Sequence, residues 1–460
     1  MNRRSRDVGS RRIGGAWVIT LLAAALLALA PTAALASAPG AKGAALAPTA
    51  AGAKGAALAP TAAVASIPSA PSSTGAPQPI SSPPAVSASL VALAPTPPMG
   101  WNPWYKFGCQ ANEQLIEQTA QAIVSSGMAA AGYRYVNLDD CWMAASRDSS
   151  DALQADPQAF PDGIPALASY VHGLGLKLGI YLDAGTQTCM LRPGSAAHFA
   201  QDAATVASWG VDFIKVDYCY TNLIPAQPVY ATMQQAILAA RRPIVYSISD
   251  DGFDRPWFWG PGLASLWRTT NDYTAYGARS GDWWGAVLKI LDINAGLYRF
   301  AQPGAWNDPD ILLIGTGLLT VPQERSQFSL WSMMAAPLLA GGDVRTMSQA
   351  TAAILTNGEV IAVDQDPAGR QGVRIADRSG HQVWIRRLLD GSIAVLFLNT
   401  ASQPATITMS AARAGVGRHQ RYAVRDLWHH RSWSSSAPTI RARVAPDDVV
   451  MLRVGPATSG

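Results

Sequence analysis

Two charged residues close an apolar run in the middle of the chain. Residues 211–217 read VDFIKVD, and their valine, phenylalanine and isoleucine indicate a strand that is covered on both faces. An unpaired charge inside such a strand costs roughly several kcal/mol, so Lys215 and Asp217 need a reason to be there. Because they stand two residues apart, both side chains point to the same side of an extended strand. We therefore expect both to point into a functional site.

Charged residues also follow the other apolar runs, at the point where each run ends. They are Asp139, Asp140, Asp183, Arg268, Asp272, Asp308 and Asp310. Taken alone, each carboxylate could be a helix cap, a turn residue or a surface charge. For Asp183 and Asp308 the sequence favours such a structural role and a catalytic role equally. Their recurrence favours two carboxylates across a pocket, which suit glycoside hydrolysis: one attacks the sugar carbon and the other protonates the leaving oxygen. Trp104 and Tyr181 could stack on the apolar face of a sugar ring.

The charged residues fall at the ends of predicted strands that alternate with predicted helices. The apolar runs lie at 99–101, 133–140, 176–183, 211–217, 243–249, 264–268, 304–310 and 337–343, and helical patterns include 113–131, 195–209, 228–241 and 323–336. Eight β/α units at this spacing predict a parallel (β/α)8 TIM barrel, although a doubly wound sheet would give a similar spacing. The carboxyl ends of barrel strands form the open face, which is where the charges fall.

The pattern changes near the C-terminus. From about residue 372 the chain carries no helical pattern and alternates apolar with polar residues, as in 391–399 and 448–454. This alternation predicts the antiparallel strands of a small β-sandwich that packs against the barrel. We expect the barrel to span 92–371 and the C-terminal β-sandwich to span 372–460.

The first 91 residues are expected to lie outside the folded domains. Residues 1–36 combine an arginine-rich start, an apolar run and small residues suited to cleavage near Ala36, which is typical of an export signal. The run is short for a membrane span, and a retained anchor is the alternative. Residues 37–91 are almost wholly Ala, Pro, Gly, Ser and Thr, with GAKGAALAPTAA twice in tandem, and indicate a disordered linker. We expect a secreted protein without stable membrane association after cleavage.

Four cysteines follow the signal, and exported proteins keep disulfides. Four cysteines allow three pairings. The pairing that is local in sequence joins Cys109 to Cys141 and Cys189 to Cys219. Without close Cys-x-x-Cys spacing the sequence argues against a zinc site. The formal charge of +4, part of which leaves with the signal, gives no nucleic-acid footprint.

Several motifs between about Pro97 and the C-terminus resemble the α-galactosidases of glycoside hydrolase family 27, the melibiase group. In chain order they are TPPMGWNPW, LDDCW, GLKLGIYLDAG, FIKVDYC, WR followed by Asp272, WNDPD and EVIAVDQDPAGRQG. The resemblance implies a (β/α)8 barrel followed by an antiparallel β domain, and a retaining mechanism. It also implies an oligosaccharide or polysaccharide substrate, no cofactor and no metal.

The resemblance assigns a role to each motif residue. Asp217 would be the nucleophile and Asp272 the acid/base. The polar groups around the sugar hydroxyls would be Asp139, Asp140, Lys215, Arg268 and Asp310. Trp104 and Tyr181 match aromatic contacts, and the pair Cys189 and Cys219 matches a disulfide beside the nucleophile.

One segment departs from the family pattern. Many α-galactosidases carry a Cys-Glu-Trp or similar element after the fifth strand, whereas this chain has YSISDDGF, with Ser249 and Gly252 facing the sugar's 2-substituent. Small residues there resemble the α-N-acetylgalactosaminidase branch, which needs room for an acetamido group. Activity on β-L-arabinopyranosides or release of isomaltose stays open as well. A non-catalytic sugar-binding protein would not need both carboxylates, and a metal-dependent hydrolase would favour an Asp-x-Asp-x-Asp-Gly loop, which the sequence lacks.

Overall fold

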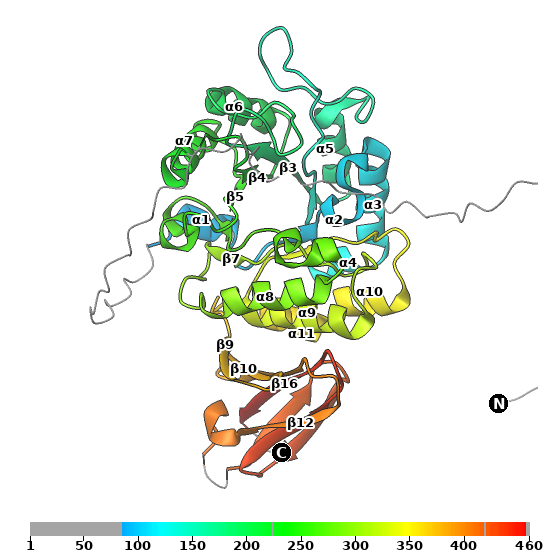
Figure 1. Cartoon of the computed structure of the whole chain (residues 1–460), viewed down its shortest axis with the longest axis vertical. Helices are drawn as coiled ribbons and strands as arrows, with labels where there is room; N and C mark the ends of the chain where they lie inside the picture. Colours follow the sequence, from blue (N-terminus) through cyan, green and yellow to red (C-terminus); the bar gives the residue numbers. More distant parts are fainter. Residues whose placement is uncertain (1–84, 223, 418–419, 457–460) are drawn as a thin grey trace, which may run out of the picture. The chain divides into compact units, whose positions relative to one another are not determined.

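The computed structural model describes residues 85–222, 224–417 and 420–456 (Figure 1). The expected signal peptide and the expected linker up to residue 84 lie outside the described residues. Helix α1 (Ala88–Leu93) begins within the last residues of the range expected for the linker. The side chain of Ser87 caps this helix by accepting a hydrogen bond from the amide of Leu90 at 3.3 Å, and Leu90 itself is buried.

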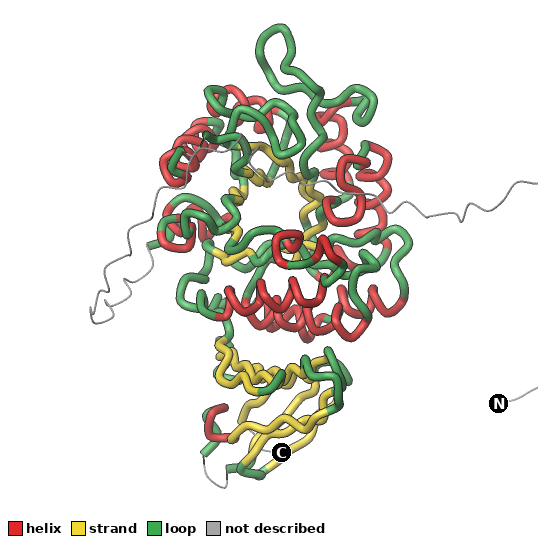
Figure 2. The backbone as a smooth tube through the Cα atoms, in the orientation of Figure 1, coloured by secondary structure: helices red, strands yellow, loops and turns green. Residues whose placement is uncertain are grey.

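Eight parallel strands form the predicted barrel. They are β1 (Met99–Trp101), β2 (Tyr135–Asn137), β3 (Lys177–Asp183), β4 (Phe213–Asp217), β5 (Val245–Ser249), β6 (Leu266–Arg268), β7 (Trp306–Asp308) and β8 (Leu338–Ala340). The strands pair in the order β7-β6-β5-β4-β3-β2-β1-β8, and a parallel bridge between Leu312 and Ala340 joins the segment after β7 to β8. Figure 2 shows these strands as a ring with helices outside it. The predicted fold class is confirmed, and each strand lies within one of the predicted apolar runs.

Helices follow most of the barrel strands. They are α2 (Trp104–Phe107), α3 (Glu113–Ser125), α4 (Met128–Ala131), α5 (Gly163–Gly173), α6 (Phe199–Ser208), α7 (Ala226–Ala239), α8 (Trp283–Ala295), α9 (Val321–Met334), α10 (Gln349–Leu355) and α11 (Gly358–Asp364). The helix predicted over 113–131 is split because Gly127 adopts a left-handed conformation with φ 86°. The connection from β5 to β6 holds only two short 3₁₀ helices, η2 (Pro256–Phe258) and η3 (Gly260–Gly262), since its glycines and prolines disfavour an α-helix.

The C-terminal domain contains two antiparallel sheets. One has the order β14-β13-β16-β11-β10-β9 and the other pairs β12 with β15. Their strands are β9 (Val373–Arg378), β10 (His381–Arg387), β11 (Ile393–Asn399), β12 (Ala405–Ser410), β13 (Tyr422–Asp426), β14 (Arg431–Ser435), β15 (Thr439–Val444) and β16 (Asp448–Pro456). The apolar alternation missed β9 and β14, because most of their residues are partly or fully exposed.

The central strand β11 of the larger sheet is buried on both faces. On β11, Ile393, Val395 and Phe397 pack inside the sandwich, while the alternate residues Ala394, Leu396 and Leu398 belong to the barrel core. Polar groups add to this contact. Arg386 on β10 is 1% exposed and donates to the carbonyl of Ser332 at the end of α9 at 2.6 Å, and Arg325 on α9 pairs with Asp448 on β16. The β domain therefore packs against the barrel, as the sequence predicted.

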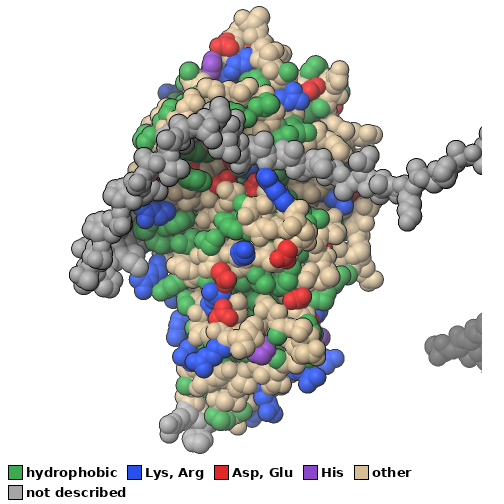
Figure 3. All heavy atoms as spheres, viewed as in Figure 1, with side chains coloured by type: hydrophobic (Ala, Val, Ile, Leu, Met, Phe, Trp, Pro, Cys, Tyr) green, Lys and Arg blue, Asp and Glu red, His purple; other side chains and the backbone are tan. Residues whose placement is uncertain are grey.

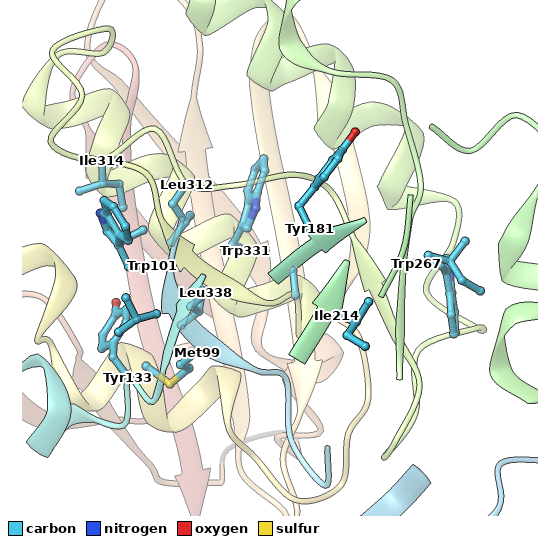
Figure 4. Packing of buried hydrophobic residues seen from close by; sticks show 14 of the residues in the cluster. Met99, Trp101, Tyr133, Tyr181, Ile214, Trp267, Leu312, Ile314, Trp331 and Leu338 are labelled. Atoms are coloured by element: carbon cyan, nitrogen blue, oxygen red, sulfur yellow. The ribbon is translucent and has the colours of Figure 1, made fainter. Parts of the chain in front are cut away.

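The barrel core and the surface of the C-terminal domain differ in the side chains that they contain. Figure 4 shows part of the barrel core, where the labelled side chains include Met99 and Trp101 of β1, Leu312, Ile314, Trp331 and Leu338. On the face in Figure 3, Lys and Arg side chains gather over the C-terminal domain, and all of these are arginines because the sequence has no lysine after Lys289. The exterior of this domain is therefore polar and basic on that face.

Two disulfides join the four cysteines, Cys109 with Cys141 and Cys189 with Cys219. The sequence-local pairing is confirmed. The first bridge ties the segment after α2 to the loop after β2, and the second ties the loop after β3 to the end of β4. Both therefore brace the loops at the carboxyl ends of the strands.

We expect replacement of both Cys109 and Cys141 by serine to lower the free energy of unfolding by about 3 kcal/mol, because the bridge closes a loop of roughly 30 residues in the unfolded chain. Thermal or urea unfolding of the variant and of the parent protein measures the difference. Mass spectrometry of the unreduced parent should find no free thiol. Two free thiols, or an unchanged unfolding midpoint, would contradict the bridge.

Candidate active site

The residues that the sequence singled out for chemistry gather at one end of the barrel. Each lies in the last residues of a strand or in the loop that follows it: Trp104 after β1, Asp139 and Asp140 after β2, Tyr181 and Asp183 on β3, Lys215 and Asp217 on β4, Ser249 and Gly252 at β5, Arg268 and Asp272 at β6, and Asp308 and Asp310 at β7. Strand register sets Asp183, Asp217 and Ser249 side by side. Parallel strands thus bring together side chains that are far apart in the sequence.

Asp217 is held by two hydroxyl groups from the neighbouring strands. The hydroxyl of Tyr181 donates to Oδ2 at 3.0 Å, and the hydroxyl of Ser249 donates to Oδ1 at 3.1 Å. Burial, followed by the nearby charge of Asp217, raises the pKa of Tyr181 well above its usual value, so the phenol keeps its proton and acts as a donor. Donors to both oxygens stabilise the ionised carboxylate and fix its orientation.

Asp183 anchors two loops beside this carboxylate. Its side chain is 0% exposed and accepts hydrogen bonds from the amides of Gly185 at 2.7 Å and Cys219 at 3.0 Å. Burial, and then the charge of Asp217, raise the pKa of Asp183 well above its ordinary value. The contacts assign Asp183 a loop-anchoring role, which is one of the two roles that the sequence left open.

Lys215 pairs with the first of the two adjacent aspartates. Its ammonium group lies 3.0 Å from Oδ2 of Asp139, which also accepts a hydrogen bond from the side chain of Asn102 at 2.7 Å. Burial lowers the pKa of Lys215, but the carboxylates of Asp139 and Asp217 outweigh it, so the pKa is raised overall and the lysine stays charged. Burial raises the pKa of Asp140 to about 6, and this side chain accepts the amide of Met190 at 2.9 Å.

Arg268 joins two carboxylates on the other side of the site. Its Nη1 lies 3.1 Å from Asp272 and its Nη2 lies 3.0 Å from Asp310. The Oδ2 atom of Asp310 that contacts Arg268 also accepts a hydrogen bond from the hydroxyl of Tyr105 at 2.6 Å. The backbone of Asp310 is in the left-handed region, with φ 91°. Burial raises the pKa of Asp310 to about 7, against the opposing effect of Arg268. Asp308 accepts the amide of Asp310 at 2.9 Å and so shapes this turn.

Three of the residues predicted to contact the sugar also serve the fold. Ser249 is 1% exposed and its hydroxyl is engaged by Asp217. Gly252 has φ 73°, and a Cβ there would stand 2.4 Å from the carbonyl oxygen of Thr269, so the backbone alone requires glycine. Trp104 is half-buried at the start of α2, and its amide is held by Asn102 at 2.9 Å.

Two residues of the site were not predicted from the sequence. Asn102 and Tyr105 bind Asp139 and Asp310, and both follow β1, whose end the sequence did place. The polar residue directly after the MGW run was the available signal for Asn102. Tyr105 had none, because an aromatic residue in a short helical turn is ordinary.

Asp217 and three neighbouring side chains have the composition of a metal site. Ligand atoms of Asp183, Cys189, Asp217 and Cys219 all lie within 4.8 Å of one another. The two sulfur atoms are joined in a disulfide, which leaves no thiolate to bind a metal. The donor set therefore does not fit a soft metal ion.

Comparison with known proteins identifies the family. The family model described as alpha galactosidase A matches residues 96–366, and the alpha galactosidase C-terminal beta sandwich domain matches residues 378–454. The alpha-galactosidase A of Cellvibrio japonicus is 44% identical over 378 residues, which cover 79% of this chain and 93% of that protein. The alpha-N-acetylgalactosaminidase of Gallus gallus is 38% identical over 390 residues, which cover 79% and 94%.

A solved structure agrees with these matches. The alpha-galactosidase I from Mortierella vinacea superposes with a TM-score of 0.75 at 34% identity, covering 80% of this chain and 99% of that one. The two family models thus match both the barrel, which carries the strand-end carboxylates, and the C-terminal β domain. This chain belongs to the melibiase-type α-galactosidases, glycoside hydrolase family 27, and is a glycosidase.

Proposed function

We propose that the protein removes terminal α-galactosyl groups with retention of configuration. Asp217 attacks the anomeric carbon and the bond to the leaving oxygen breaks, while Asp272 gives that oxygen a proton. Water then hydrolyses the galactosyl ester of Asp217, with Asp272 taking the proton from the water. The observation that carries this proposal is the pair of hydroxyl donors that hold both oxygens of Asp217 at the end of β4.

The remaining polar residues suit recognition of the sugar hydroxyls. Lys215 and Arg268 supply donors, and Asp139, Asp140 and Asp310 supply acceptors, all at strand ends around Asp217. Trp104 offers an apolar ring face for the sugar. A mixture of fixed donors and acceptors distinguishes sugars well, because a missing hydroxyl leaves a buried group unpaired.

A second candidate sugar follows from the loop after β5. The chain has small side chains at Ser249 and Gly252, where an α-N-acetylgalactosaminidase would need room for an acetamido group, and one relative carries that name. Both small residues also serve the fold, because Ser249 donates to Asp217 and Gly252 packs against the backbone of Thr269. We therefore rank α-galactosides first.

A panel of p-nitrophenyl glycosides tests the sugar. We expect kcat/KM for the α-galactoside to exceed the values for the α-N-acetylgalactosaminide and the β-L-arabinopyranoside. Proton NMR of the first turnovers should show α-galactose before mutarotation, because two displacements at the same carbon restore its configuration. Initial formation of β-galactose would exclude the covalent mechanism, and a higher value for the acetamido sugar would favour the second candidate.

We also propose that the enzyme is exported and acts on oligosaccharides or polysaccharides. The arginine-rich start of the chain and the two disulfides support export. None of the helices in the described part of the chain is long and apolar enough to cross a membrane. Detection of the protein in culture medium, with its N-terminus near residue 37, tests the signal.

A further inference from the structure

The connection from β5 to β6 presents an aromatic ring to solvent. Phe253 is 80% exposed, although it stands only four residues after the buried Ser249. A ring in this position adds little to the core, because most of its surface stays in water. Folding therefore does not account for its exposure.

The loop that carries Phe253 is firmly held. The carboxylate of Asp250 accepts the amides of Gly252 and Asp254, each at 3.1 Å, and the amide of Phe253 donates to the carbonyl of Asp250 at 3.0 Å. Asp254 in turn accepts the amide of Ala226 at 2.8 Å, which ties the loop to the start of α7. A ring on such a support is preorganised, so little conformational entropy is lost when a ligand contacts it.

The tip of the loop lies beside the segment that carries the proposed acid/base. The α-carbon of Gly252 faces the carbonyl oxygen of Thr269, which would stand 2.4 Å from a Cβ at that position. Asp251 interacts electrostatically with Arg268 and with Tyr276, and these residues lie on either side of Asp272 in the sequence. Because the acid must reach the leaving oxygen, the leaving group of the substrate lies on this side of the site.

We infer that Phe253 is a stacking surface for the sugar unit to which the terminal galactosyl group is attached. The inference rests on the proposed function and assigns to one residue a preference for galactosides whose leaving group is itself a sugar. The apolar face of a pyranose packs against an aromatic ring as other apolar surfaces do. This contact needs neither a charge nor a hydrogen bond from the aromatic side chain. Phe253 is in this sense a specificity-determining residue rather than a catalytic one.

The test compares two substrates that differ only in the leaving group. For Phe253→Ala we expect kcat/KM on raffinose to fall about tenfold. The value on α-galactosyl fluoride should stay within twofold of the parent, because fluoride offers no ring to stack. Phe253→Trp should keep most of the activity on raffinose. The matched control is Phe258→Ala, since Phe258 is 42% exposed in the same connection but packs edge-on against Phe300 at 5.1 Å; it should leave the ratio of the two values unchanged.

The outcomes distinguish a failure of the role of Phe253 from a failure of the proposed function. An unchanged ratio for Phe253→Ala, or an equal change for Phe258→Ala, would overturn the role of Phe253 while leaving the proposed function intact. If the parent protein cleaves neither raffinose nor α-galactosyl fluoride, the proposed function fails, and the inference fails with it.

Discussion

Replacing Asp217 by asparagine should lower kcat by a factor on the order of 10⁴ or more, because an amide does not attack the anomeric carbon and no other group of the site takes its place. The change is nearly isosteric. Tyr181 and Ser249 still face the side chain, so the fold should be kept. Steady-state rates on p-nitrophenyl α-galactoside and thermal unfolding of the same sample measure the two effects.

A matched control lies on the same strand segment. Asp212 precedes β4 and its carboxylate bonds Arg242 at 2.6 Å and His172 at 2.7 Å, about 16 Å from Asp217 at the usual rise per residue. Asp212→Asn should affect stability rather than kcat, as expected for the amino-terminal end of a barrel strand. If Asp217→Asn kept a tenth of the parent rate, Asp217 could not be the nucleophile.

External azide gives a positive signal for the same assignment. In Asp217→Gly the space of the carboxylate is open, and azide can attack the anomeric carbon from that side while p-nitrophenolate leaves. A single displacement inverts the configuration, so the product should be β-galactosyl azide. An α-configured azide, or no azide product together with normal folding, would place the nucleophile elsewhere.

One physical reason explains why the sequence predicted the barrel and placed most residues of the candidate site at its strand ends. A parallel barrel strand is buried on both faces, so a charge at its end, such as Lys215 or Asp217, stands out against the apolar run before it. The two-residue period of a strand then places both side chains on one side. The disulfides were a choice among three pairings, and only the structure decided between them.

Other features depend on how the barrel closes, which the sequence does not specify. Tyr105 binds Asp310, which is 205 residues away in the sequence, because the segment after β7 lies next to β8 and β1. This segment joins β8 through Leu312, beyond the end of the predicted strand. The connection from β5 to β6 has no α-helix, so its periodicity gave no indication that Phe253 would be exposed there.

The second large effect is expected at Asp272, and it should depend on the substrate. Removing a general acid costs typically 10²–10⁴-fold, but only where the leaving oxygen needs a proton. For Asp272→Ala we therefore expect about a 10³-fold loss of kcat/KM on raffinose and a much smaller loss on 2,4-dinitrophenyl α-galactoside, whose phenolate leaves without help. Parallel assays of the two substrates give the ratio directly.

The contacts of Asp272 indicate why the effect should be chemical rather than structural. Its carboxylate lies on the loop after β6, 22% exposed, and forms an ion pair with Arg268, which also holds Asp310. Arg268 thus keeps Asp310 as a partner when Asp272 is replaced, so the free energy of unfolding should change little.

The matched control is Asp282→Ala, ten residues further on. This change removes a cap from α8 and should lower the free energy of unfolding by about 1 kcal/mol, with an effect on the rate that does not depend on the leaving group. Equal losses on both galactosides would mean that Asp272 binds the sugar instead of protonating the leaving group.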